Sequence, residues 1–270
     1  MTVLTAMPRL IRQLCQGAAP ALTAAALAVA ALPLSARALP EAEVTTKLDS
    51  ILMLMAVDAK GNPRAVSAVV DNKPTNAYLA ALSIAAAEEI TAGKRYAVSK
   101  QDAASLRFAP VSLARYYQLL QPLLQRNPKD LGVIAPDPAQ INTAEKLLIA
   151  QKVPAATARQ VAALQPMVFC PEPGLLVSFN EGPEKGKPFV PCSTDASVVE
   201  GMMQRGIKES EQLAKANLHL VAIPLNNFVS YLREEPSERV GQLRVLSSGR
   251  MVELVQQLNK QAQTGTTPAR

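Results

Sequence analysis

Two stretches of the 270-residue chain decide its fold: Leu106–Leu120, LRFAPVSLARYYQLL, and Leu218–Leu232, LHLVAIPLNNFVSYL. They align without a gap at an offset of 112 residues, which places Tyr116 on Phe228. Each begins with alternating apolar residues, as in a strand, and continues with apolar residues spaced as on one face of a helix. Similarity at a fixed distance indicates an internal duplication.

The similarity continues on both sides of these stretches. Downstream, Leu131–Ile134 falls on Leu243–Leu246 at the same offset. Upstream, Ala65–Ser67 falls on Leu176–Ser178 after a slip of one residue, which one short loop difference explains. Short strand-like runs alternate with helix-like runs in each copy. We therefore expect an α/β fold, with α+β as the alternative, in which two pseudo-symmetric halves each contain short strands and about three helices.

The first 38 residues have the pattern of a targeting segment. Arg9 and Arg12 precede an Ala- and Leu-rich run, and Ala36–Ala38 supplies a small-x-small cleavage site. The run is short for a membrane span and contains prolines. We therefore expect export, to the periplasm or alternatively to a thylakoid lumen or plastid intermembrane space. The expected organisation is a cleaved signal peptide over 1–38, an N-terminal half over 39–158, a C-terminal half over 159–263 and a disordered tail over 264–270.

The charge of the chain gives little support for nucleic-acid binding. The formal net charge is +6, but Arg9, Arg12 and Arg37 lie in the segment expected to be removed. Without these three, 25 basic residues face 22 acidic ones. No stripe of Lys and Arg interleaved with aromatic residues is present, so a basic nucleic-acid surface is not indicated.

Two cysteines remain after the expected cleavage, Cys170 and Cys192. Both lie in strand-like segments, 166–170 and 188–192. An even number of cysteines in an exported protein suggests a disulfide. The alternative is that both are small buried apolar residues.

Residues that carry catalysis are scarce. His219 is the single histidine, and with two cysteines it cannot supply the ligands of a usual zinc site. No nucleophile-elbow sequence occurs, and Gly182–Lys187 lacks the spacing of a phosphate-binding loop. We therefore expect a protein that is not an enzyme and binds no metal or other cofactor.

Several segments, taken in order, resemble the Tic22 family, the intermembrane-space subunit of the chloroplast import machinery and its cyanobacterial relatives. They are LPEAEV (39–44), DAKG (58–61), FAPVSL (108–113), VIAPDPA (133–139) and PMVF (166–169). The resemblance implies a two-winged, butterfly-like α/β scaffold with concave apolar surfaces. It also implies a transport factor with chaperone-like holdase activity that aids outer-membrane protein biogenesis or translocation. The implied partners are unfolded or translocating envelope proteins and Omp85-type outer-membrane assembly machinery.

Apolar helix residues are the candidates for holding such clients. They are Tyr116, Tyr117, Leu119, Leu120, Leu123 and Leu124 in the first copy and Phe228, Tyr231 and Leu232 in the second. The alternative is that they form the inward face of core helices, which the regular spacing of 113, 116 and 120 favours. Leu119 and Leu123 fall off that stripe and are the stronger groove candidates. A small-molecule-binding protein and a purely structural envelope protein remain alternative functions.

Overall fold

A computed structural model describes residues 38–70, 72–179, 185–235 and 240–264. The expected signal peptide lies outside the described residues except for Ala38, and the expected tail lies outside them except for Thr264. The glycine-rich loop over 182–187 is described only from Lys185 onward.

The first half of the chain forms a five-stranded sheet. Its strands are β1 (Leu52–Val57), β2 (Ala65–Val70), β3 (Lys73–Ala81), β4 (Arg107–Ser112) and β5 (Leu131–Ala135). The long strand β3 pairs antiparallel with both β1 and β2 along one edge and parallel with β5 along the other. β4 pairs antiparallel with the outer edge of β1. β5 therefore closes one side of this sheet.

The second half forms a sheet with the same connectivity. Its strands are β6 (Met167–Glu172), β7 (Val177–Ser178), β8 (Pro188–Ser193), β9 (His219–Pro224) and β10 (Leu243–Leu246). β8 pairs antiparallel with β6 and β7 and parallel with β10, while β9 pairs with β6. The hydrogen bonds at the first residue of the helix after β4 and of the helix after β9 also correspond between the two halves. Leu113 N donates to Ile51 O at 2.9 Å, and Leu225 N donates to Pro166 O at 2.8 Å.

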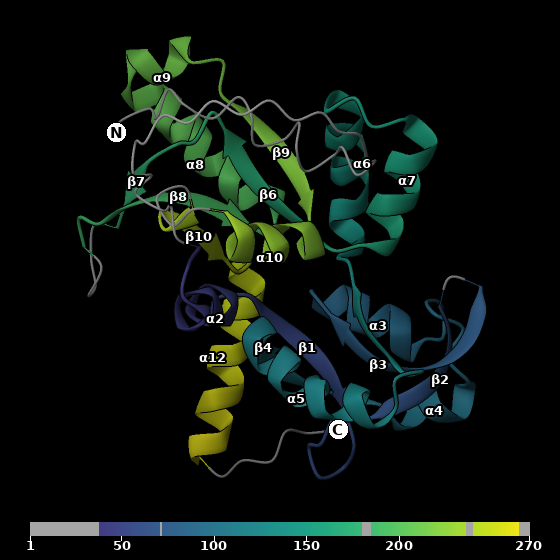
Figure 1. Ribbon diagram of the computed structural model, residues 1–270. Coiled ribbons are helices and arrows are strands. Elements are labelled where there is room, and N and C mark those ends of the chain that lie inside the picture. The colour runs from purple at the N-terminus through teal and green to yellow at the C-terminus, as the bar shows by residue number, and fades with distance from the viewer. Residues whose placement is uncertain (1–37, 71, 180–184, 236–239, 265–270) are drawn as a thin grey trace, which may run out of the picture.

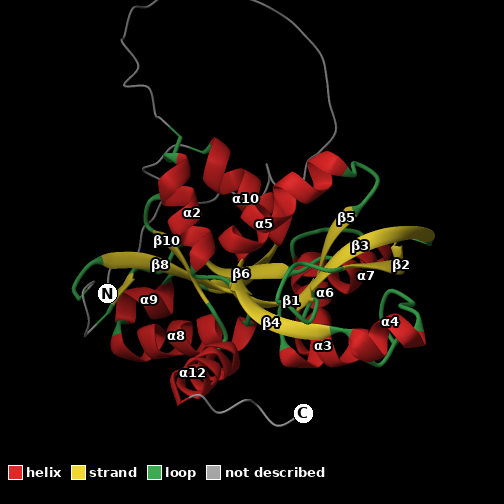
Figure 2. Cartoon of the chain, turned by 90° about the horizontal axis from the view of Figure 1, so that it is seen from below, coloured by secondary structure: helices red, strands yellow, loops and turns green. Residues whose placement is uncertain are grey.

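Helices cover both faces of the sheets. Those of the first half are α2 (Glu41–Asp49), α3 (Ile84–Thr91), α4 (Lys100–Ser105), α5 (Leu113–Arg126), the 3-10 turn η1 (Pro138–Gln140) and α6 (Ile141–Ala150). Those of the second half are α7 (Ala155–Leu164), α8 (Ala196–Glu209), α9 (Glu211–Lys215), α10 (Leu225–Glu234) and α12 (Gly249–Thr264). Figure 2 shows α2, α10 and α5 on one side of the strands and α3, α4, α8 and α12 on the other. The expected mixture of short strands and helices is confirmed.

One apolar cluster, here called the shared cluster, joins the two halves. Residues of α2, α5 and α10 pack in it against β1, β3, β6, β8, β9 and β10. Its largest buried members include Tyr116, Phe228, Leu113, Leu225 and Leu232. On the opposite faces lie two separate clusters: a second one around Leu54, Leu79 and Ile90, and a third one around Phe169, Phe189 and Met203.

The two halves exchange their last helices. α6 follows β5 but packs in the third cluster, where Ala144 and Leu148 are buried against the second sheet. α12 follows β10 but brings Met251 and Leu254 into the second cluster on the first sheet. Figure 1 shows α12 beside β1 and α6 beside β9. Each half therefore completes the apolar packing of the other.

The segment before the first strand of each sheet breaks this symmetry. α2 packs into the shared cluster through Val44 and Leu48, and Lys47 Nζ donates to the carbonyls of Gly241 and Leu243 at 2.8 Å each. α7 precedes β6 as α2 precedes β1, but it packs on α6 in the third cluster through small residues. The edge of β10 is therefore covered by α2, whereas β5 has no such helix over its edge among the described residues.

Ser210 ends α8 and caps α9. One sequence expectation needs correction. The alignment of 131–134 on 243–246 is one residue out of phase, because Ile134 and Val245 both belong to the shared cluster whereas Val133 belongs to the second.

Cys170 and Cys192 form a disulfide, directly opposite one another on β6 and β8. Both residues are buried in the shared cluster, 6% and 0% exposed. The bond closes a loop with a sequence separation of 22 residues. A cross-link of this span removes conformations from the unfolded chain and so stabilises the folded one.

Reduction of this disulfide should lower the free energy of unfolding by about 3 kcal/mol, the loss expected for a loop of this length. Urea unfolding with and without a thiol reductant measures the difference. The Cys170→Ala/Cys192→Ala variant is the control, because its unfolding midpoint cannot respond to the reductant. An equal midpoint for the wild type with and without reductant would show that the bond contributes nothing.

Candidate functional site

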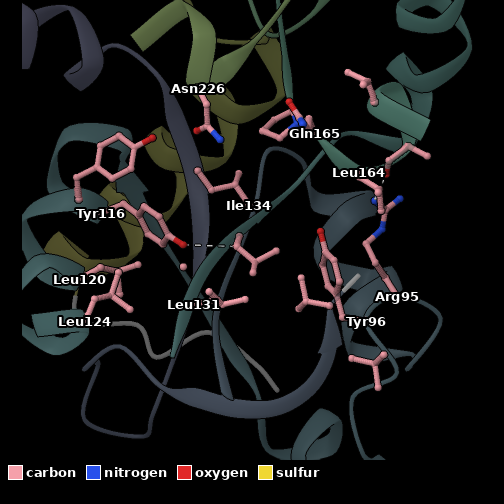
Figure 3. Close-up of a pocket in the computed structure, with 18 of the residues that line it drawn as sticks. Arg95, Tyr96, Tyr116, Leu120, Leu124, Leu131, Ile134, Leu164, Gln165 and Asn226 are labelled. Carbon is pink, nitrogen blue, oxygen red and sulfur yellow. Dashed lines mark hydrogen bonds between the residues drawn. The ribbon is translucent and has the colours of Figure 1, made fainter. Parts of the chain in front are cut away.

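A groove of about 1760 Å³ surrounds the edge of β5. One wall is α5, the opposite wall comes from β2 and the segment after α3, and the end of α7 with the start of β6 forms a third (Figure 3). Asn226 and Arg233 of α10 and Glu41 of α2 also line it. The apolar and aromatic lining residues are Val69, Val70, Tyr96, Tyr116, Tyr117, Leu120, Leu124, Pro128, Leu131, Val133, Ile134, Ile141, Val161, Ala163, Leu164 and Pro166.

The wall formed by α5 is rigidly anchored. Ser112 caps the helix by accepting from Arg115 N, which fixes the start of α5 directly after β4. Tyr116 is 1% exposed, and its hydroxyl donates to Tyr78 O on β3 at 3.1 Å. Burial raises the pKa of Tyr116 well above its ordinary value, so this hydroxyl stays a donor at physiological pH. The wall is therefore uncharged and tied to the sheet.

Gly132 allows α5 to lie close to β5. A Cβ at this position would come within 2.8 Å of Leu120 Cδ1 and 3.2 Å of Tyr116 Oη. Glycine in a strand commonly marks such a close approach. Because Gly132 has no side chain and is exposed, its main chain faces the groove directly.

Ion pairs occupy part of the polar lining. Arg95 Nη2 lies 2.8 Å from Glu89 Oε2, and Arg233 Nη2 lies 3.1 Å from Glu41 Oε1. Lys94 also lines the groove and has no ion-pair partner among the described residues. The groove thus combines an apolar floor with one net positive charge.

The structure divides the candidate residues from the sequence into three groups. Tyr116, Tyr117, Leu120 and Leu124 line the groove. Leu119 and Leu123, the stronger candidates by sequence, do not line it and pack half-buried against the shared cluster. Phe228, Tyr231 and Leu232 are buried core residues, 1%, 5% and 0% exposed, so the second copy presents no matching groove surface at these positions. Whether any of them binds a client stays a prediction.

The two most accessible apolar residues of the groove, Leu131 and Leu164, were not among the candidates from the sequence. Leu131 is 42% exposed and Leu164 is 44% exposed. Leu131 begins a strand and Leu164 ends an Ala-rich helix, and neither position has a periodic signal of its own. The packing of α7 against α6 places Leu164 in the wall of the groove.

His219 was the one histidine weighed as a catalytic or metal-binding residue. His219 is exposed on β9 and its Nε2 lies 3.5 Å from Glu172 Oε2 on β6. Across residues 38–264, the described positions contain no group of three or more His, Cys, Asp or Glu side chains that could hold a metal. No described helix is both long and apolar enough to cross a membrane.

The fold is similar to two solved structures. Anabaena Tic22, described with the words protein transport, superimposes with a TM-score of 0.60 at 17% identity, over 86% of this chain and 99% of that one. The chain has a Tic22-like fold. Tic22 from Plasmodium falciparum superimposes with a TM-score of 0.55 at 14% identity, over 80% of this chain and 98% of that one. No protein-family profile matches the sequence, and no curated protein is similar to it in sequence.

This Tic22-like fold is the one that the order of sequence segments indicated. Identities of 17% and 14% establish the architecture of the chain, and they leave its activity to be argued from the groove.

Substitution Gly132→Ala should destabilise the protein by about 1–3 kcal/mol, because the added methyl group pushes Leu120 and Tyr116 away from β5. Gly201→Ala is the matched control, since a Cβ at Gly201 in α8 meets nothing within 4 Å. Alanine in that helix should stabilise by about 0.5–1 kcal/mol. Urea unfolding distinguishes the two, and equal stability of both variants would contradict the close packing at Gly132.

Substitutions Leu119→Ser and Leu123→Ser should each lower the free energy of unfolding by about 1 kcal/mol, because both side chains are partly withdrawn from water. Leu131→Ser should leave the thermal midpoint nearly unchanged, since Leu131 is 42% exposed. Calorimetry of the three variants provides the test. Unchanged midpoints for the first two would return Leu119 and Leu123 to the set of surface groove candidates.

Proposed function

We propose that this protein is a transport factor of the cell envelope that holds unfolded polypeptides in the groove at β5. Its clients are proteins in transit, including outer-membrane proteins, and it acts as a holdase that aids their biogenesis or translocation. The periplasm is the proposed location. An Omp85-type assembly machinery is the proposed acceptor of the clients.

The groove is the observation that carries this proposal. Its volume of about 1760 Å³ exceeds the roughly 300–1,000 Å³ of ordinary small-molecule pockets. Apolar walls suit many sequences, because dispersion and the hydrophobic effect need no fixed donor geometry. Four of its five charged lining residues form two ion pairs, Arg95 with Glu89 and Arg233 with Glu41. The groove therefore fits an apolar chain better than a small charged metabolite.

The fold and the sequence support the same proposal. Anabaena Tic22, which shares the architecture, is described with the words protein transport. The basic and Ala-rich N-terminal pattern is typical of an exported protein. The described residues hold no group of three or more His, Cys, Asp or Glu that could bind a metal, and the groove is lined mainly by apolar side chains, so its surface suits binding.

Suppression of aggregation tests the proposal. An outer-membrane β-barrel protein diluted from urea should scatter less light in the presence of near-stoichiometric amounts of the purified protein. The Leu131→Lys/Leu164→Lys variant should lose most of this effect, because two charges enter the apolar groove. The control is Ile149→Lys/Ile207→Lys, which alters residues of similar exposure outside the groove, 43% and 36% exposed.

Three results would count against the proposal. Scattering that the wild type does not reduce would remove the holdase activity. Equal loss in both variants would show that general surface hydrophobicity is responsible. An unaffected groove variant would move the client site elsewhere on the protein.

A further inference from the structure

The outer edge of β5 offers unpaired main-chain groups. Leu82 N donates to Ala135 O at 3.1 Å, so Ala135 directs its carbonyl toward β3. The N–H and C=O groups of one strand residue point to the same side, and successive residues alternate. Gly132 and Ile134 therefore direct theirs away from β3. No described residue hydrogen-bonds these groups, and no described strand pairs with this edge.

The equivalent edge in the second half is not left open. Val190 N donates to Gln242 O at 2.8 Å, which by the same alternation directs Leu243 away from β8. The carbonyl of Leu243 accepts from Lys47 Nζ, and α2 lies over that edge. The chain thus supplies a hydrogen-bond donor and a covering helix to the edge of β10, while α7 packs on α6 and no described helix lies over the edge of β5.

Apolar walls stand on both sides of the free edge. Tyr117 and Leu124 belong to the shared cluster on one face of the sheet. Val70 and Tyr96 belong to the second cluster on the other face. A strand added beside β5 would lie roughly 4.8 Å from it and would send alternate side chains toward the two walls. A helix in the same place could use one face only and could not pair with Gly132 and Ile134.

The charges of the groove restrict the occupant further. Lys94, Arg95 and Arg233 line it against Glu41 and Glu89, which leaves a net positive charge. Both arginines are ion-paired, and among the described lining residues Lys94 is the cation without an ion-pair partner, so it can pair with an acidic group of a client. A segment flanked by acidic residues fits this lining better than one flanked by basic residues.

We propose that β5 binds its client by strand addition: an extended, apolar segment with acidic flanks pairs with the main chain of Gly132 and Ile134. This rests on the proposed holdase function and specifies how the client is held. Main-chain pairing would give affinity for many sequences, and the two walls would favour strands with apolar residues on both faces.

Backbone methylation of a probe peptide tests the pairing. The probe is a labelled peptide of about eight residues in which Leu and Thr alternate between terminal Glu residues, long enough for one strand. One version is N-methylated at the Leu amides and the other at the Thr amides. In strand addition, one set of amides faces β5 and the other faces solvent, so one version should bind about tenfold more weakly than the other by fluorescence anisotropy.

The protein offers a matched pair of variants for the same assay. Ile134→Pro removes the outward N–H and leaves the β3–β5 ladder intact, since proline is tolerated at a strand edge. Ile134→Ala removes more of the apolar side chain but keeps the N–H. Binding of the unmethylated peptide should fall about tenfold in the first variant and less than about threefold in the second. Circular dichroism shows whether both variants are folded. If Ile134→Pro does not fold, the two methylated peptides still test strand pairing on the wild-type protein.

Charge reversal provides an independent readout. Wild type should prefer the Glu-flanked peptide over a Lys-flanked one, and Lys94→Glu should reverse the order.

Equal binding of the two methylated peptides, or wild-type binding by folded Ile134→Pro, would overturn strand addition. If strand addition is overturned in this way but the Leu131→Lys/Leu164→Lys variant no longer suppresses aggregation, the holdase function stands without strand addition. A methylation pattern without any suppression of aggregation would leave strand addition standing and remove the holdase.

Discussion

The rest of the structure depends on the burial of both sheets against one apolar cluster. Tyr116 and Phe228, at matching positions in the two copies, are each 1% exposed in that cluster. Neither half could bury this face alone, because α2, α5 and α10 lie over strands of both sheets. Apolar area removed from water is the main favourable term in folding. The halves therefore fold as parts of one body, and the disulfide between β6 and β8 lies inside the same cluster.

The exchange of α6 and α12 extends this dependence to the outer faces. Gln151, just after α6, accepts from Ala222 N at 2.9 Å and donates to Ala222 O at 3.2 Å, which satisfies the main chain of β9. On the other side, Met251 of α12 is 2% exposed in the cluster that contains Leu54. The linker between the halves is consequently short and ordered, and α7 is held beside α6. This placement of α7 withdraws it from the site that α2 occupies in the other half.

The groove follows from that departure from symmetry. Two sheets with the same strand connectivity have equivalent edges, at β5 and at β10. Lys47 and α2 cover the edge of β10, and no described residue pairs with the edge of β5 between α5 and the end of α7. Open edges with apolar surroundings are usually avoided, because they recruit other chains. In a protein that handles unfolded clients, the same property becomes useful.

The sequence by itself determined the local elements and the duplication-like pattern. The stretches 106–120 and 218–232 become β4–α5 and β9–α10 at the expected offset, because alternating and 3.6-residue patterns each suit one secondary structure. The order of sequence segments also indicated the Tic22-like fold, and the cysteine count indicated the pair Cys170 and Cys192. Tyr116 and Leu120, whose spacing favoured the inward face of a core helix, are buried in the shared cluster. Together with Tyr117 and Leu124 they line the groove, whereas Leu119 and Leu123 do not. Amphipathicity tells which face is apolar, but it does not tell what covers that face. Only the tertiary structure decided that α2 covers β10, that α7 packs on α6 away from the edge of β5, and that Leu131 and Leu164 line the same groove. These contacts join residues far apart in the chain, and no local pattern encodes the direction in which a helix packs after its turn.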